Sequence, residues 1–279
     1  MRIGDIAIAR SGDKGNVVNI SVIAREKRYF PIIERVVTGE MVKEYFSGMV
    51  KGEVEVFVLP HLCAINVVLH QALDGGVTGS IRLDKHGKTM SGYLLNMEFG
   101  LDYELKHYVV LTSTNDIAKE MAENEASEGT VVWADRQTEG RGRKGDPWES
   151  HDGGLYFSII LRPEVKPEKT IVLPLLTGMA VHRAMKKLGV ECRIKLPNDV
   201  MVNGKKLCGI LCENSIIDNM VRYVVVGVGV NINNPVPPSG ISLKEIIGKE
   251  FSIKEILNLI LLEFELEYME FLAMDYLFG

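Results

Sequence analysis

The sequence lacks an excess of positive charge: among its 279 residues, 32 Lys and Arg stand against 37 Asp and Glu, a formal net charge of −5. A dedicated nucleic-acid binder usually carries a basic face, so this balance argues against nucleic acid as a partner. No apolar run reaches the roughly 20 residues that a bilayer span needs. The N-terminus shows no signal-peptide pattern. We therefore expect a cytoplasmic protein with no nucleic-acid or membrane partner.

Cysteine is also scarce. The four cysteines (Cys63, Cys192, Cys208 and Cys212) are too few for a disulfide framework in a chain of this length. Cys208 and Cys212 are four residues apart, but no second pair or nearby histidine completes a zinc site. Buried, reduced thiols are expected instead. The apolar content of 46% and charged content of 25% are ordinary for a globular protein.

The first hundred residues alternate short strand-like and helix-like segments, which predicts a small α+β layer fold. Strands are expected at residues 5–9, 19–24, 54–60 and 80–84. Apolar residues at helical spacing predict helices at 31–46 and 64–73, the second ending at the glycines that follow it. Residues 87–99 fit either a helix or a strand.

A second, larger αβ unit begins near residues 99–108, so we place the domain boundaries at 1–100 and 101–279. Two domains also agree with the chain length. Strands are expected at 109–111, 130–136, 155–163, 192–199, 206–214 and 224–232. Helices are expected at 115–124, 170–189 and 252–272. Ser113 and Thr114 precede the first helix at the position of an N-cap, and Gly189 ends the second one.

A basic, glycine-rich segment, TEGRGRKGDPW at residues 138–148, raises the question of an anion ligand. Its glycines disfavour both helix and strand. The segment matches G-x-G-x-x-G, but the residues after it cannot begin the helix that a dinucleotide-binding turn requires. A P-loop also fails, because Lys144 is not followed by Ser or Thr. Taken alone, the segment could equally be a solvated basic turn.

Further polar motifs recur at strand ends through the same unit, and together they point to a family. They are STN at 113–115, QTEGRGRKGDPW at 137–148, KLPND at 195–199, KLCGIL at 206–211 and GVGVN at 227–231. In these motifs, residues 105–279 resemble the catalytic domain of biotin protein ligases. The resemblance implies a fold shared with lipoate ligases and class II aminoacyl-tRNA synthetases, a mixed sheet with flanking helices.

The resemblance also implies an activity. Biotin and ATP, with Mg²⁺, would give biotinyl-adenylate and pyrophosphate. The biotinyl group would then pass to a lysine of a biotin carboxyl carrier protein, or of the carrier domain of a biotin-dependent carboxylase. Asp199 is a candidate acceptor for the proton that this lysine loses. No metal ligand is identified beyond the Mg²⁺ that accompanies ATP.

The site residues follow from the same resemblance. Arg141, Arg143 and Lys206 would be catalytic, because cations must offset the repulsion between a carboxylate and an α-phosphate. The biotin site would comprise Ser113, Thr114, Asn115, Gln137, Gly140, Arg141, Gly142, Arg143, Tyr156, Lys206, Gly209 and Gly227. The ATP or adenylate site would comprise Arg143, Trp148, Lys195, Asn198, Asp199 and Asn231.

Three departures from the family pattern bear on the two alternatives, of which they favour only the sensor. Leu196 stands where the family usually has Trp, Asp146 stands where many relatives have Arg, and the small β-barrel domain that usually follows the catalytic domain is not seen. A lipoate or octanoyl transferase on the same fold is one alternative, which the GRGR segment with Gln137 disfavours because it is typical of the biotin branch. A sensor that retains biotin or its adenylate without transferring it is the other. A homodimer could form if the strand at 224–232 paired at a sheet edge.

The N-terminal segment has no helix-turn-helix pattern. Residues 1–98 instead resemble the ferredoxin-like domain at the C-terminus of acyclic-terpene-utilisation (AtuA-type) proteins. The residues that match its polar signature are Ser11, Asp13, Lys14, Asn19, Asn66, Arg82 and Asp84, to which we assign no chemistry. His61 and His70 are expected to be structural. We hypothesise that this domain tethers the chain to a carboxylase or its carrier.

Overall fold

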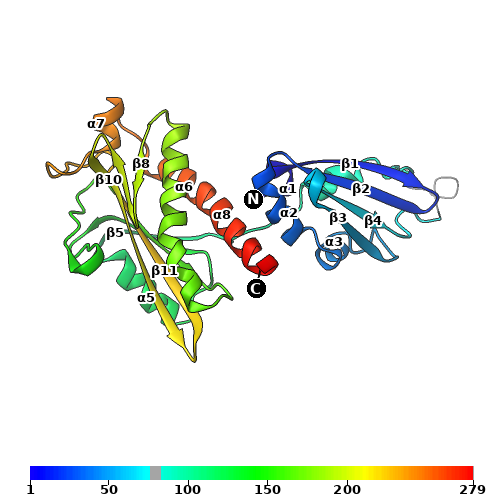
Figure 1. Ribbon diagram of the computed structural model, residues 1–279, viewed down its shortest axis with the longest axis horizontal. Coiled ribbons are helices and arrows are strands. Elements are labelled where there is room, and N and C mark those ends of the chain that lie inside the picture. The colour runs from blue at the N-terminus through cyan, green and yellow to red at the C-terminus, as the bar shows by residue number, and fades with distance from the viewer. Residues whose placement is uncertain (76–82, 279) are drawn as a thin grey trace. The chain divides into compact units, whose positions relative to one another are not determined.

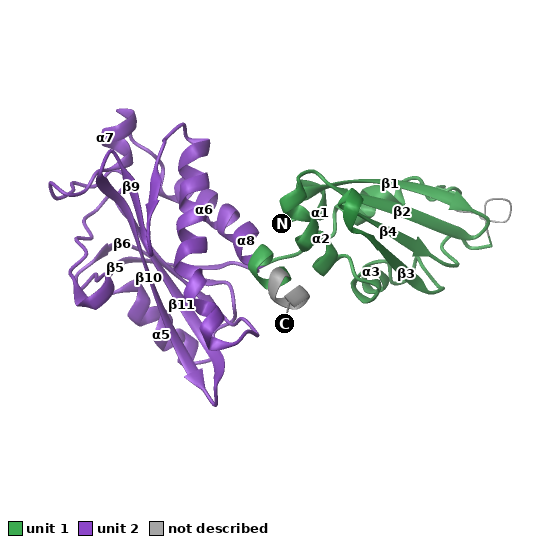
Figure 2. Ribbon diagram, in the orientation of Figure 1, with its two compact units in different colours: residues 1–100, 269–279 green, residues 101–268 purple. Residues whose placement is uncertain are grey.

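The computed structural model describes residues 1–75 and 83–278, so Arg82 and most of the strand expected at 80–84 lie outside the described residues. The chain divides into two compact units (Figure 2). The first comprises residues 1–100 and 269–279, and the second comprises residues 101–268. Each unit is described by itself below.

The first unit contains a four-stranded antiparallel sheet with the order β1-β2-β4-β3 (Figure 1). Its strands are β1 (Ala7–Lys14), β2 (Val17–Ala24), β3 (Val54–Leu59) and β4 (Ala64–Leu69), and its helices are α1 (Ile3–Ile6), α2 (Phe30–Val36), α3 (Gly39–Tyr45) and α4 (Met90–Leu95). Short 3₁₀ turns occupy Lys27–Tyr29 and Pro60–Leu62. Val18, Ile20 and Val22 are fully buried, whereas the residues between them reach the surface. One face of the sheet is therefore core, as the expected α+β layer fold requires.

The helix expected at 64–73 is wrong, because this segment forms strand β4 between β2 and β3. Ile65, Val67 and Leu69 share the buried face of this central strand, but Val68 adds an apolar residue on the other face and interrupts the alternation that marks a strand. The helix expected at 31–46 is also interrupted, since α2 ends at Val36 and α3 begins at Gly39. The Thr38 hydroxyl accepts a hydrogen bond from the Met41 amide at 3.2 Å and caps α3.

The second unit is built on a seven-stranded sheet with the order β5-β6-β7-β11-β10-β9-β8. Its strands are β5 (Glu104–Leu111), β6 (Thr130–Gln137), β7 (Leu155–Leu161), β8 (Arg193–Lys195), β9 (Asp199–Val202), β10 (Lys205–Ile217) and β11 (Met220–Val230). β5 and β6 are parallel and the other pairs are antiparallel, so the sheet is mixed, as the resemblance implies. β11 lies between β7 and β10, so the expected pairing of this strand at a sheet edge is wrong.

Helices flank this sheet, and their bounds are α5 (Thr114–Glu123), α6 (Leu173–Lys187) and α7 (Leu243–Ile247). A fourth helix, α8 (Ile253–Phe278), begins in this unit, and its residues from Met269 onward belong to the first unit. 3₁₀ turns span Arg143–Gly145 and Pro167–Val172. Ala118 and Ala122 of α5 pack against Val132, Ile160 and Val225 of the sheet, which fixes the start of α5 beside the ends of the central strands. Within residues 1–75 and 83–278, no helix is both long and apolar enough to cross a membrane.

Candidate functional site

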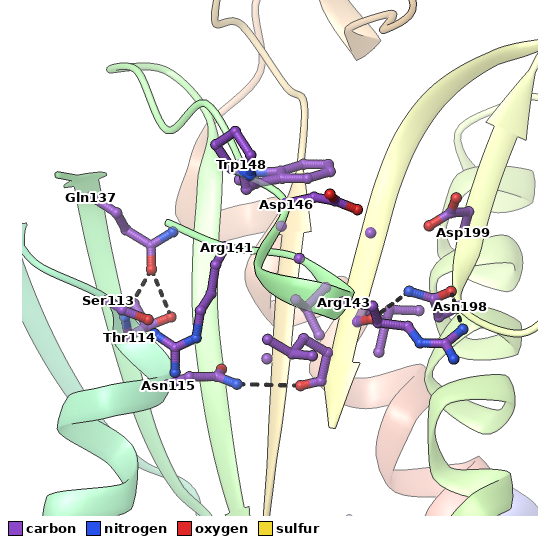
Figure 3. A pocket seen from close by; sticks show the side chains of 18 of the residues that line it. Ser113, Thr114, Asn115, Gln137, Arg141, Arg143, Asp146, Trp148, Asn198 and Asp199 are labelled. Atoms are coloured by element: carbon purple, nitrogen blue, oxygen red, sulfur yellow. Dashed lines mark hydrogen bonds between the residues drawn. The ribbon is translucent and has the colours of Figure 1, made fainter. Parts of the chain in front are cut away.

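A cavity of about 370 Å³ opens in the second unit between the start of α5, the loop after β6, and strands β10 and β11. Figure 3 shows Gln137, Thr114 and Arg141 on one wall, with Asn198 and Asp199 across from them. The cavity brings together thirteen of the residues expected in the site: Ser113, Thr114, Asn115, Gln137, Arg141, Gly142, Arg143, Trp148, Asn198, Asp199, Lys206, Gly209 and Gly227.

Four expected residues do not line the cavity: Gly140, Tyr156, Lys195 and Asn231. Tyr156 is buried and its hydroxyl donates to the His151 carbonyl at 2.8 Å, with burial raising the pKa of the phenol. The Asn231 amide donates to the Lys206 carbonyl at 3.2 Å. Both side chains therefore support the backbone behind the site.

Two glycines form a flat platform under Trp148. Gly209 and Gly229 are direct partners across β10 and β11. A Cβ atom on Gly209 would lie 2.8 Å from Trp148 Cζ3, and one on Gly229 would lie 2.7 Å from Trp148 Nε1. The Lys206 ammonium is 5.1 Å from the centroid of the indole ring, within the range of a cation–π contact. The indole thus lies against a glycine surface, and the Lys206 ammonium lies beside it, 3.2 Å from where a Cβ atom on Gly209 would be.

Arg141 reaches two carboxylates that the sequence motifs do not include. Its Nη1 and Nη2 donate to the two oxygens of Asp116 at 2.7 and 2.6 Å, and Nη2 also donates to Glu213 Oε2 at 3.3 Å. The bidentate hydrogen bonds are the chief reason that the pKa of Asp116 is lowered. Burial opposes the ionised form of Glu213, but hydrogen bonds from Asn115 and Lys119 keep the pKa of this carboxyl below its ordinary value.

The other two expected catalytic cations differ in how firmly they are held. The Lys206 ammonium forms an ion pair with Asp199 at 2.7 Å. Arg143 is exposed, and its Nη1 donates to Asn198 Oδ1 in a long contact of 3.5 Å. Of the three cations, Arg143 therefore has the weakest protein partner in the part of the chain that the structure describes.

A chain of hydrogen bonds stabilises the opposite end of the cavity. The Thr114 amide and hydroxyl both donate to Gln137 Oε1, at 2.8 and 3.1 Å, and Gln137 Nε2 donates to Ser150 Oγ at 2.9 Å. The buried Ser158 hydroxyl lies 2.8 Å from Thr114 Oγ1 and 2.6 Å from Asn115 Oδ1. Sequence reasoning missed Ser158, because a single serine within an apolar strand gives no functional signal.

The remaining lining residues, which the expected site did not include, are Lys144, Asp146, Pro147, Ile210, Leu211, Val228 and Gly229. All seven belong to the motifs quoted from the sequence, so their proximity to the cavity could have been inferred. The cavity has neutral hydroxyl and amide groups on one wall, where Arg141 is paired with Asp116 and Glu213, and the cations Arg143 and Lys206 lie beside Asn198 and Asp199 on the other. Such an arrangement suits a ligand with an amide-like head and an anionic tail.

Comparisons with known proteins agree with this geometry. Residues 1–100 match the AtuA ferredoxin-like domain, and residues 107–231 match the biotin/lipoate A/B protein ligase family. The bifunctional ligase/repressor BirA of Bacillus subtilis is 39% identical over 191 residues, which cover 63% of this chain. The chain spans 59% of the length of that relative.

Two solved structures resemble the chain at a TM-score of 0.51. One is the biotin protein ligase of Aquifex aeolicus in complex with biotin and ATP, which is 33% identical. The match covers 59% of this chain and 69% of that one. The other is the biotin protein ligase of Leishmania major in complex with biotinyl-5-AMP, which is 28% identical. That match covers 58% of this chain and 73% of that one.

Proposed function

Because the chain belongs to the biotin/lipoate A/B protein ligase family, we propose that it is an ATP-dependent biotin protein ligase. In the first step a carboxylate oxygen of biotin attacks the α-phosphorus of ATP, and the bond to pyrophosphate breaks. In the second step the amine of a carrier lysine attacks the acyl carbon, AMP leaves, and the amine loses a proton. The carrier is a biotin carboxyl carrier protein or domain.

One observation carries this proposal: a single cavity is lined both by cations and by neutral hydrogen-bonding side chains. Arg143 and Lys206 lie where they can offset the charge of a carboxylate and a phosphate that must approach each other. Ser113 and Gln137 lie at the other end, where an uncharged ureido ring needs donors and acceptors. The two reacting anions need the cations, and the uncharged ring of biotin needs the neutral groups, so one site must hold both.

The Trp148 platform supports a nucleotide as the second substrate. An indole ring fixed on glycines offers an aromatic face to an adenine base, and the cation at Lys206 lies beside the same ring. The loop that carries Trp148 would cover the acyl-adenylate and shield its mixed anhydride from water.

Mg²⁺ would accompany ATP and be held mainly by the phosphates of the nucleotide. Among the described residues no group of three or more His, Cys, Asp or Glu side chains could hold a metal ion. Mg²⁺ in nucleotide sites is usually held by one or two carboxylates and the substrate phosphates. Asp146 and Asp199 are the carboxylates on the cavity wall, and Asp199 is already paired with Lys206.

Mass spectrometry of a carrier domain tests the function directly. The full chain is incubated with ATP, Mg²⁺, a biotin carrier domain and either biotin or lipoate. We expect the carrier to gain the mass of a biotinyl group and to remain unchanged with lipoate. A lipoyl increment would favour a lipoate transferase, and ligand binding without any increment would favour a sensor.

A pair of adjacent lysines provides a matched control. Lys206→Met removes the cation that lies in the cavity, and the loss of one preorganised donor is expected to slow adenylate formation by about 10²- to 10³-fold. Lys205→Met removes an exposed neighbour on the same strand and is expected to leave the rate unchanged. Equal rates in the two variants would contradict the role of Lys206.

A further inference from the structure

Asp116 and Glu213 both bind Arg141, which suggests that Arg141 and Arg143 have different roles in the basic loop at residues 138–148. We infer that Asp116 and Glu213 are positioning residues, which hold Arg141 as the fixed end of the loop so that Arg143 and the loop tip meet the ligand. This inference rests on the proposed function for the identity of the ligand. It also differs from the sequence-based expectation, in which Arg141 and Arg143 act alike.

The geometry at Arg141 leaves little of its charge for a ligand. Three of its five guanidinium hydrogens face inward, because Nη1 and Nη2 bind both oxygens of Asp116 and Nη2 also reaches Glu213. Lys119 lies 3.2 Å from Asp116 and 3.0 Å from Glu213. Two cations and two anions thus form a closed cluster with no net charge, which attracts a further anion weakly.

The acids come from rigid parts of the second unit. Asp116 lies in the first turn of α5, and Glu213 lies within β10, paired with Val225 of β11. Glu213 is held in turn by Asn115 Nδ2 at 2.7 Å, and a Cβ atom on Gly227 would lie only 2.0 Å from the other side of that amide. The floor beneath Arg141 is therefore fixed by helix and sheet packing before any ligand binds.

The loop is fastened at its base, whereas its tip is exposed and, as far as the structure describes the chain, its side chains have only the long contact between Arg143 and Asn198. The Trp148 amide donates to the Gly140 carbonyl at 2.8 Å, and Arg141 bridges to Pro147. The tip then turns on a hydrogen bond from the Gly142 amide to the Asp146 carbonyl at 2.7 Å. Residues 143–146 are exposed, so the part of the loop able to move onto a ligand begins after Arg141.

Limited proteolysis of the full chain without ligand tests the inference independently of any reaction. Trypsin cleavage requires local opening, so its rate at each basic residue reports how firmly that residue is held. We expect wild-type protein to be cut after Lys144 and to resist cleavage after Arg141. In Asp116→Asn/Glu213→Gln, cleavage after Arg141 should become at least about tenfold faster, as expected when charge-assisted hydrogen bonds are lost.

A carboxylate elsewhere on α5 supplies the matched control. Glu123 binds Arg222 outside the cavity, so Glu123→Gln also neutralises an ion-paired acid of the same helix. It should leave cleavage after Arg141 at the wild-type rate. Equal cleavage in wild type and the double variant would overturn the inference, as would an equal increase in the Glu123 variant.

Steady-state adenylate formation separates positioning from chemistry. We expect Asp116→Asn to raise the KM for biotin by about tenfold with little change in kcat, and Asp116→Glu to restore most of the loss. A loss confined to kcat would overturn the inference, because the acid would then act on the reacting atoms. If wild-type protein forms no adenylate, the proposed function fails, and the proteolysis result still decides whether Arg141 is anchored.

Discussion

A methyl group added at Gly229 should remove Trp148 from its platform. The Cβ of Gly229→Ala would lie 2.7 Å from Nε1 and Cε2 and 3.1 Å from Cζ2 of the indole, and these are the three nearest atoms that it meets. The backbone of Gly229 lies outside the positive-φ region, so alanine causes no strain of its own. The substitution therefore acts on the indole, which must move because the sheet beneath it cannot.

The size of the effect follows from the cost of overpacking. Inserting one methyl into a close contact typically costs about 1–3 kcal/mol, and here the conflict is relieved by moving Trp148 and giving up its stacking surface. A loss of about 2 kcal/mol of nucleotide affinity corresponds to an increase of about 30-fold in the KM for ATP. The KM for biotin should change much less, because Ser113 and Gln137 are not touched.

Fluorescence gives a second measurement that needs no reaction. The chain has two tryptophans, so Trp133→Phe leaves Trp148 as the reporter. The Trp133 indole nitrogen is buried without a hydrogen-bond partner among the described residues, so replacing Trp133 by phenylalanine leaves no acceptor unpaired. In this background Gly229→Ala should shift the Trp148 emission to longer wavelength.

A control places the same methyl in ordinary contact. A Cβ atom on Gly178 of α6 would meet Ile194 and Ile210 at 3.6 Å, so Gly178→Ala should alter neither the emission nor the KM for ATP. If Gly229→Ala left both quantities at their wild-type values, the indole would not rest on the glycine pair, and Trp148 would not be the surface that binds the nucleotide.

Three further predictions concern stability and reactivity. The pKa values of Asp116 and Glu213 are lowered in the folded protein, so these carboxylates stabilise the fold fully above their unfolded pKa values of about 4. This contribution to stability is lost as pH falls through the folded pKa values. In urea unfolding, wild type should therefore lose stability in acid more steeply than Asp116→Asn/Glu213→Gln. Thr38→Ala should lower the free energy of unfolding by about 1 kcal/mol, measured by urea denaturation, because α3 loses its cap. Burial raises the pKa of Cys192 to about 11 and that of Cys208 further, so mass spectrometry should find both thiols poorly alkylated by iodoacetamide at neutral pH.

Much of the secondary structure could be predicted because short strands and amphipathic helices leave periodic patterns. The exception at Ala64–Leu69 is instructive. Ile65, Val67 and Leu69 are fully buried on one face of β4, and Val68 is only half-buried on the other. Because Val68 is apolar as well, the alternation of apolar and polar residues is incomplete, and the same short sequence pattern would fit a buried helix. The β-branched residues were the better guide, since they pack well on a pleated surface.

The candidate site was predicted less evenly. Motif spacing identified the loop and the strand ends that form the cavity, because those residues are polar where packing alone would favour apolar side chains. It could not reveal the partners of Arg141. Asp116 is 25 residues away and Glu213 is 72 residues away, and nothing in either segment marks a carboxylate that will face a guanidinium. Ion pairs between distant segments are set by the topology of the sheet.

At the glycine platform, the sequence predicts which residues belong to the site but not how they are arranged. Gly209 and Gly229 belong to two motifs that, in sequence, suggest only that the backbone approaches a ligand closely. The register of β10 on β11 makes them opposite partners, and the hydrogen bond between Trp148 and Gly140 brings the indole over both. The absence of a side chain at each glycine thus leaves the space that the Trp148 indole occupies. A substitution at either position should therefore resemble a substitution of Trp148 itself, a relation that only the folded sheet reveals.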